Sequence, residues 1–159
     1  MPQASAFHLL VRWAQRAHGL LTRPLTLGVR ALALDESGRA FLVRHTYAAG
    51  FYLPGGAVEP GETAPDALAR ELAEEGRLLL LEAPQLFGFY HNPRHSRRDH
   101  VALYVARVSQ EGPRAPDWEI AECGFYPLGA LPEDATEATR ARVAEFLGLA
   151  PIDNVWREK

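Results

Sequence analysis

Residues 56–78 read GAVEPGETAPDALARELAEEGRL, a glycine- and proline-rich segment followed by a helical pattern. Glycine and proline interrupt regular structure, so the first part of this stretch is predicted to be a loop. Thr63 with Asp66 three residues later is typical of a helix N-terminus, and Pro65 falls in the first turn, where proline is tolerated. The pattern predicts a helix that runs to about Gly76, which we expect to serve as its C-cap.

Three acidic side chains share one side of this predicted helix. Glu71, Glu74 and Glu75 stand at positions i, i+3 and i+4, within a sector of about 100°. Like charges at these spacings destabilise a helix by about 0.2–0.5 kcal/mol per pair. Such a cluster is often no more than a solvated face, but a divalent cation would turn the repulsion into attraction. Carboxylate oxygens are hard ligands that suit Mg²⁺ or Mn²⁺.

The segment resembles the signature of the Nudix hydrolases, G-x5-E-x7-R-E-U-x-E-E-x-G-U, in which U is a bulky aliphatic residue. One position departs from it, because Arg77 stands where the signature has its late glycine and Gly76 comes one residue earlier. We expect altered loop geometry at the helix exit and retained metal binding. The residues in register are Gly56, Glu62, Arg70, Glu71, Leu72, Glu74, Glu75 and Leu78.

The resemblance implies a set of metal ligands and supporting residues. In similar enzymes the ligands are a carbonyl just before the signature and the helix glutamates, and the arginine orients a glutamate through a charge-assisted bond. The Mg²⁺ site, which Mn²⁺ could also fill, would therefore use the Gly55 carbonyl with Glu71, Glu74 and Glu75. Arg70 would orient a helix glutamate, while Glu62 and Gly56 would support the site.

Many members of the family add a glutamate from a loop near the end of the sheet, as a ligand or as a general base. Glu119 is the first choice for this role and Glu122 the second, because both precede the strand expected at Phe125. The alternative is that both are solvated loop acids. The predicted catalytic residues are Glu71, Glu119 and Arg70.

The rest of the chain mixes strands and helices without a regular βαβ rhythm. Strands are predicted at 25–34 and 39–45, which form a hairpin, and at 77–82, 86–90, 101–108 and 125–128, with a second helix at 132–147. This pattern favours α/β or α+β layers around a mixed sheet, and the resemblance implies the α/β/α sandwich of the Nudix fold. We assign residues 24–150 to that domain and 151–159 to a C-terminal tail.

Residues 1–23 are predicted to form an additional amphipathic helix. An apolar stripe recurs at three- and four-residue steps, and Arg12 and Arg16 lie off it. This helix could lie on a membrane surface, on its own domain or on a second copy, and we expect a homodimer. The sequence contains no run of about 18 apolar residues, the length needed to span a bilayer, so a cytoplasmic location is expected. The net charge of −3 argues against wrapping by nucleic acid, and the single Cys123 excludes an internal disulfide.

Clues to the substrate are concentrated in residues 91–100, HNPRHSRRDH, the densest positive patch in the sequence. Arg94, Arg97, Arg98 and His95 are candidates for contact with a substrate phosphate, because arginine matches phosphate oxygens. The alternative is a solvated loop between two strands. Tyr52 could stack on a base, although packing in the sheet explains an aromatic residue equally well.

The predicted activity is Mg²⁺-dependent hydrolysis of a pyrophosphate bond. The substrate would be a nucleoside diphosphate linked to another group, of the ADP-ribose or nucleotide-sugar type, or an ordinary or oxidised nucleoside triphosphate. A metal-bound water has a lowered pKa and attacks phosphorus after a glutamate takes its proton. The alternative is a sensor that binds a nucleotide without turnover. The complete set of Glu71, Glu74, Glu75 and Arg70 favours the enzyme.

Overall fold

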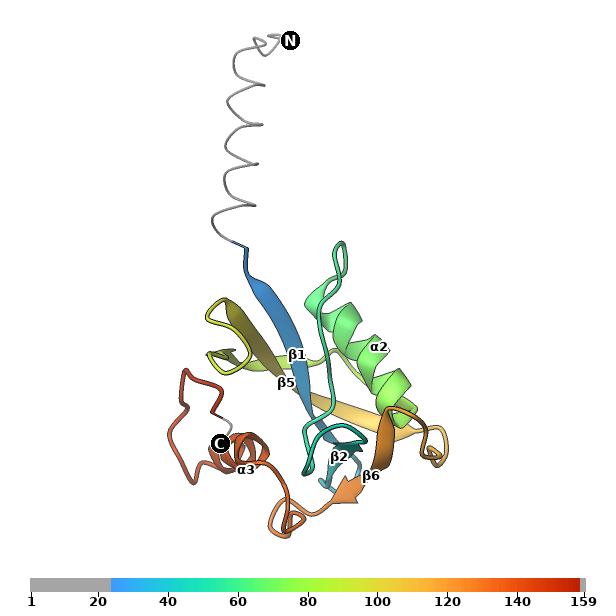
Figure 1. Ribbon diagram of the computed structural model, residues 1–159. Helices are drawn as coiled ribbons and strands as arrows, with labels where there is room; N and C mark the ends of the chain where they lie inside the picture. Colours follow the sequence, from blue (N-terminus) through green and yellow to red (C-terminus); the bar gives the residue numbers. More distant parts are fainter. Residues whose placement is uncertain (1–23, 158–159) are drawn as a thin grey trace, which may run out of the picture.

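Within residues 24–157, which the computed structural model describes, six strands form one mixed sheet with a helix on each face (Figure 1). The chain orders its elements as β1 (Thr26–Leu34), β2 (Ala40–His45), α2 (Ala64–Gly76), β3 (Leu78–Leu80), β4 (Gln85–His91), β5 (Asp99–Gln110), β6 (Ile120–Tyr126) and α3 (Glu137–Phe146). The strand order in the sheet is β3-β5-β1-β2-β6, and β4 also pairs with β5.

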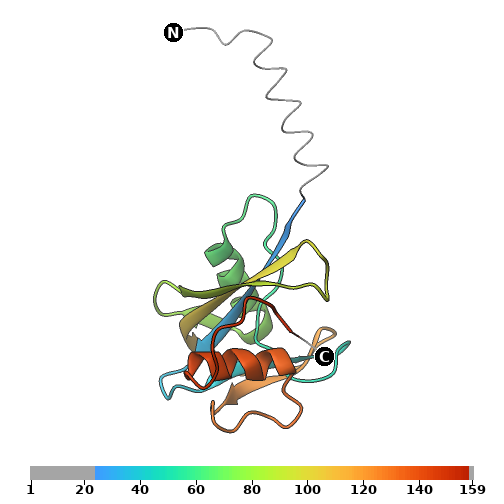
Figure 2. The same ribbon diagram turned by 90° about the vertical axis from the view of Figure 1, so that its left-hand side faces the viewer.

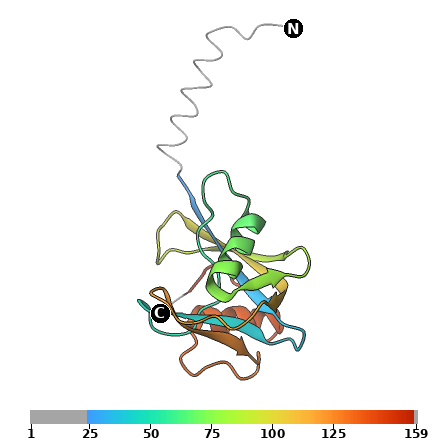
Figure 3. The same ribbon diagram turned by 90° about the vertical axis from the view of Figure 1, so that its right-hand side faces the viewer.

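Alternating side chains of β1 serve two separate cores. Val29 and Ala31 point toward α2, whose Leu68 and Leu72 are fully buried against them. Leu32 belongs to the opposite core, which also holds residues of α3. Figure 2 shows α3 in front of the sheet, and Figure 3 shows α2 in front from the other side. The layered arrangement expected from the sequence is confirmed.

The two edges of β1 have different partners, and this positions the loop before α2. One edge pairs in parallel with β5 along its whole length. The other edge meets β2 in register only at Leu34↔Ala40. Further back, the Val29 amide donates to the Gly56 carbonyl at 2.8 Å and the Ala31 amide to the Pro54 carbonyl at 2.9 Å. The loop therefore lies along β1 like a short extra strand, which fixes its backbone.

Helix α2 begins as predicted and ends differently. Thr63 is the N-cap, and its hydroxyl accepts the Asp66 amide. The expected C-cap at Gly76 is wrong, because Gly76 is still helical and is buried beside Phe41. The cap is Arg77, whose φ of 54° and ψ of 38° are left-handed, the conformation that glycine adopts without steric cost. Arg77 thus takes the backbone conformation that its glycine counterpart in the signature could supply.

Two elements near the C-terminus differ from their predicted bounds. The strand expected at 125–128 is β6, Ile120–Tyr126, so it begins earlier and contains Glu122. Its polar and small residues hide it from a search for apolar alternation. The helix expected from Pro132 begins at Glu137 with Thr136 as N-cap, because the Ala135 amide donates to the Pro132 carbonyl in a preceding turn.

Residues 151–157, assigned to a tail from the sequence, pack on the domain. Trp156 is 5% exposed and meets Tyr90 edge to face. Arg142 of α3 lies over both rings and pairs with Glu145 at 2.7 Å. Glu145 also accepts the Asp153 amide at 2.9 Å. This buried ion pair attaches the end of the chain to α3.

The N-terminal helix and the dimer predicted from it fall on residues 1–23, outside the described residues. Within residues 24–157, neither helix has the length and apolar character needed to cross a membrane.

The left-handed cap at Arg77 yields a stability prediction. A non-glycine residue in this conformation destabilises the folded state by about 1–2 kcal/mol. Substitution by glycine removes that cost, but part of the gain is lost because glycine has greater freedom in the unfolded chain. We expect Arg77→Gly to raise the free energy of unfolding by about 0.5–1 kcal/mol in urea denaturation. The matched variant Gly76→Ala should lower it by about 1–3 kcal/mol, because its Cβ would lie 2.6 Å from Phe41 Cε1. A neutral or destabilising Arg77→Gly would contradict the strained cap.

Candidate functional site

The acidic side of α2 faces the loop that lies along β1. Glu75 is 4% exposed, and its Oε2 accepts the Gly55 amide at 2.7 Å. Its Oε1 lies 3.7 Å from Nε2 of His45, at the end of β2. Gly55 has a φ of 137°, and a side chain there would collide with the backbone of Val29. Position 55 therefore requires glycine, and its amide joins the loop to the helix.

Glu71 and Gly56 form a second contact between helix and loop. The Glu71 carboxylate lies against the Gly56 Cα, where any Cβ would clash with it. The same Glu71 oxygen, Oε1, accepts a hydrogen bond from Arg70 Nη1 at 2.7 Å. The glycine predicted to support the site thus leaves room for a carboxylate.

Arg70 connects α2 to the loop before it at the outer part of the site. Its guanidinium donates to Glu62 at 3.0 Å, to Glu71 and to the Ala57 carbonyl at 3.0 Å, and it also reaches Glu74 at 3.3 Å. The hydrogen bonds to Glu62 and Glu71 raise the pKa of Arg70, and the bond from Arg70 lowers the pKa of Glu62. Arg70 and Glu62 therefore brace the loop against α2.

Glu119, the residue immediately before β6, lies near the same acidic cluster. Burial is the main cause of the raised pKa values of Glu75 and Tyr47, and the negative charge of Glu119 adds to both shifts. The Thr46 amide donates to the Glu119 carbonyl at 2.9 Å, which ties this residue to the end of β2. Glu122 points elsewhere and lies 3.5 Å from Arg44. Of the two candidates, the structure brings Glu119 to the helix glutamates.

The electrostatics of the cluster are dominated by burial. Burial, with smaller contributions from the charges of Glu71 and Glu119, raises the pKa of Glu75 to about 7 against the opposing effects of Arg30 and the Gly55 amide. Burial also lowers the pKa of His45, so the neighbouring imidazole offers no strong positive charge. A buried carboxylate with this pKa lacks a sufficient cationic partner.

The donor set fits a hard divalent cation in its chemistry. It consists of oxygen atoms with excess negative charge, from Glu71, Glu74, Glu75, Glu119 and the Gly55 carbonyl. Within the described part of the chain, no three His, Cys, Asp or Glu side chains are already gathered in a metal-holding geometry. The physical reason is that Arg70 holds Glu71 and the Gly55 amide holds Glu75, so binding requires side-chain rotation.

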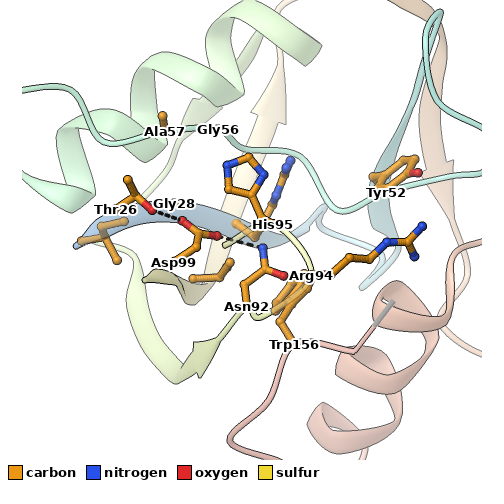
Figure 4. Close-up of a pocket in the computed structure, with 13 residues that line it drawn as sticks. Thr26, Gly28, Tyr52, Gly56, Ala57, Asn92, Arg94, His95, Asp99 and Trp156 are labelled. Atoms are coloured by element: carbon orange, nitrogen blue, oxygen red, sulfur yellow. Dashed lines mark hydrogen bonds between the residues drawn. The ribbon is translucent and has the colours of Figure 1, made fainter. Parts of the chain in front are cut away.

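A cavity of about 530 Å³ adjoins the loop beside Gly56 and Ala57. In Figure 4, Tyr52 and Arg94 stand on one side of it and Thr26, Asn92 and Asp99 on the other. The Asp99 carboxylate accepts Thr26 Oγ1 at 2.6 Å and Asn92 Nδ2 at 2.8 Å.

The basic segment 91–100 divides at this cavity. All four basic side chains Arg94, His95, Arg97 and Arg98 are exposed, but only Arg94 and His95 line this cavity, as does Tyr52. Tyr52 and Arg94 also line a second cavity of about 580 Å³ on the side of Thr136.

Sequence reasoning did not assign three residues that the structure places at the site. Arg30 is the only charged residue in the apolar run 25–34, and that exception could have marked it. Tyr47 stacks on His45 with ring centroids 5.0 Å apart, and Asp99 is the single acid in the basic segment. Their relation to the site depends on strand pairing, which no local pattern reveals.

The fold and the acidic helix find their counterparts in known proteins. The NUDIX domain family model matches residues 24–146. The chain belongs to the Nudix family. The members of this family that it resembles in sequence are named as diphosphatases or pyrophosphatases, and the chain is accordingly a hydrolase that acts on phosphorus-containing anhydrides.

Two sequence relatives and one solved structure are informative. A Bacillus subtilis protein, provisionally named 8-oxo-dGTP diphosphatase, is 30% identical over 131 residues, 82% of this Nudix chain and 85% of that protein. A Methanocaldococcus jannaschii ADP-ribose pyrophosphatase is 36% identical over 85 residues, 52% of this chain and 49% of that enzyme. The MutT Nudix hydrolase of Burkholderia pseudomallei matches with a TM-score of 0.63 and 27% identity, over 76% of this chain and 96% of that one.

The raised pKa of Glu75 predicts how the stability of the metal-free Nudix domain depends on pH. Between pH 4.5 and about 7 the folded protein keeps a proton that the unfolded chain releases, so stability falls as pH rises through this window. The loss is on the order of 3 kcal/mol. With chelator present, we expect Glu75→Gln to be more stable than the wild type at pH 8. At pH 4.5 the advantage of the variant should disappear, because Glu75 is then protonated in the folded wild type.

Thermal melting of both proteins across that pH range measures the difference. His45 titrates in the opposite sense and is present in both proteins, so the difference between the two curves reports on Glu75 and its contact with His45. Parallel curves for the two proteins would show that Glu75 is ionised in the folded state.

Proposed function

We propose that this Nudix protein is a Mg²⁺-dependent hydrolase that cleaves the diphosphate of a nucleoside diphosphate linked to another group. The observation that carries the proposal is that Glu71 and Glu75 of α2 face Gly56 and Gly55, next to a cavity that Arg94 lines, while the charge of Glu119 acts on Glu75. Carboxylates that repel one another in the metal-free protein are suited to bind a cation, and the cation in turn binds phosphate oxygens.

Each residue has a role that its contacts support. Glu71, Glu74, Glu75 and the Gly55 carbonyl would hold Mg²⁺, with Mn²⁺ as a substitute. When bound, the metal would neutralise phosphate charge and lower the pKa of a bound water. Glu119 is half-buried and would accept the proton of the attacking water or complete the ligand set.

Arg70 and Gly55 would act as positioning groups. Arg70 holds the Glu71 carboxylate at 2.7 Å, which limits the rotamers available to it. The Gly55 amide holds Glu75 until the cation competes for that carboxylate. The two contacts would hold the carboxylates beside the loop, from where side-chain rotation would bring them to the cation.

The cavities favour a substrate with two moieties. Tyr52 and Arg94 lie on the walls of both cavities, so a diphosphate bound at Arg94 would extend one group toward Asp99 and the other toward Thr136. This arrangement suits ADP-ribose or a nucleotide sugar. An oxidised nucleoside triphosphate, the substrate in the name of the Bacillus relative, would occupy one cavity with its base and the metal site with its phosphates.

A release assay tests the proposal. The purified protein is incubated with Mg²⁺ and separately with ADP-ribose, nucleotide sugars, dinucleoside polyphosphates, nucleoside triphosphates and 8-oxo-dGTP, and the phosphorylated products are separated. We expect turnover of a linked diphosphate into two monophosphates, with Glu75→Gln slower by orders of magnitude at an unchanged fold. Binding of these compounds without any turnover would favour the nucleotide sensor instead.

The division of the basic segment predicts a difference between its arginines. A charge-assisted bond contributes about 1.5–3 kcal/mol, so loss of a phosphate contact should raise KM about tenfold or more. We expect this increase for Arg94→Ala with little change in kcat, because the contact exists in the ground and transition states alike.

The matched controls are Arg97→Ala and Arg98→Ala, which remove the same charge from the same segment outside the cavities. Both should keep the wild-type KM in steady-state kinetics. Equal effects of all three substitutions would mean that the segment acts through its overall charge and not through an Arg94 contact.

A further inference from the structure

Arg30 is a charged residue in the middle of the central strand. Its neighbours Val29 and Ala31 are fully buried, while its own side chain is half-buried and lines the 530 Å³ cavity. Nη1 donates to the Leu53 carbonyl at 3.2 Å and also to the Gly55 carbonyl. A permanently charged group thus occupies the backbone oxygen that we propose as a metal ligand.

The charge of Arg30 also reaches the acidic cluster. Its positive charge opposes the rise in the pKa values of Glu75, from α2, and of Tyr47, and it adds to the effect of burial in lowering the pKa of His45 at the end of β2. The guanidinium therefore lies on the cluster side of the loop as well as on the cavity wall. Its positive charge partly neutralises the negative charge of the acidic cluster.

A divalent cation and this guanidinium would repel each other if both contacted the Gly55 carbonyl. At about 6 Å, even with the dielectric constant of water, one unit charge weakens binding of a divalent ion about tenfold. Arg30 lines the same cavity as Arg94, the proposed phosphate contact, so a bound substrate phosphate would offer it an anionic partner. A substrate diphosphate bound there would accept the guanidinium as it leaves the carbonyl.

We propose that Arg30 is an internal counter-ion that occupies the Gly55 carbonyl in the metal-free protein and transfers to the substrate diphosphate when the cation binds. The proposal rests on the proposed function for the identity of the cation and of the diphosphate. It makes Arg30 both an antagonist of metal binding in the free enzyme and a ligand of the substrate in the complex. Substrate and metal then bind cooperatively, because each removes the obstacle to the other.

Mn²⁺ titration of the substrate-free protein by calorimetry separates this role from a structural one. Arg30→Met removes both the charge and the hydrogen bonds. Arg30→Gln removes the charge but keeps a donor for the two carbonyls. We expect both variants to bind Mn²⁺ about tenfold more tightly than the wild type. The matched control Arg39→Gln removes a charge at the exposed turn before β2, where Arg39 pairs with Asp35, and should leave Mn²⁺ affinity unchanged.

Steady-state kinetics on the substrate found by the release assay, at saturating Mg²⁺, supply the second readout. Both Arg30 variants should raise KM about tenfold. Mn²⁺ affinity that is unchanged or weaker in both variants would overturn the proposal and leave Arg30 as a brace for residues 53–55. Tighter Mn²⁺ binding in a protein that hydrolyses none of the compounds would support the counter-ion and reject the proposed hydrolase. Melting curves confirm that each variant is folded, and Arg30→Gln decides the outcome if Arg30→Met is not.

Discussion

The hydrogen bond from the Gly55 amide to the buried Glu75 carboxylate joins the three parts on which the site depends. Glu75 belongs to α2, Gly55 to the preceding loop, and that loop is held along β1 by backbone hydrogen bonds. The contact requires a residue without a side chain at 55, because a Cβ there would collide with β1. A carboxylate is thereby held 4% exposed, where ionisation is costly. The same geometry that packs the helix on the sheet thus leaves a buried carboxylate with a raised pKa.

The surroundings of this bond show how the protein tolerates an excess of negative charge without a metal. Arg70 satisfies Glu62 and Glu71 from the solvent side. Burial favours a proton on Glu75, and Arg30 supplies a positive charge from β1. Each of these arrangements is reversible, since the partners are held by hydrogen bonds that a stronger ligand can replace. The stability of the metal-free fold and the readiness of the site to bind a cation are therefore two aspects of one charge balance.

The cavity depends on parts of the chain that lie far from the acidic helix. Asp99 begins β5 and fixes the end of the basic segment to Thr26 and Asn92. Trp156 lines the cavity from residues 151–157, which the Arg142–Glu145 ion pair attaches to α3. The groups that would select a substrate thus come from β5 and the end of the chain, whereas the groups that would carry out hydrolysis come from α2 and the loop before it. This separation explains why the reaction class is easier to infer than the substrate.

The sequence by itself determined α2, the loop before it and the register of its glutamates, because these depend on spacings of a few residues. It also determined the β1–β2 hairpin and, through the resemblance, the layered fold. Tertiary structure decided which distant groups join them: Glu119 and not Glu122, Arg94 and not Arg97 or Arg98, and Arg30 on the Gly55 carbonyl. It also placed Arg77, and not Gly76, at the end of α2. Local periodicity fixes which side of an element a residue occupies, but strand register and packing fix what lies opposite it, and those depend on contacts between residues far apart in the chain.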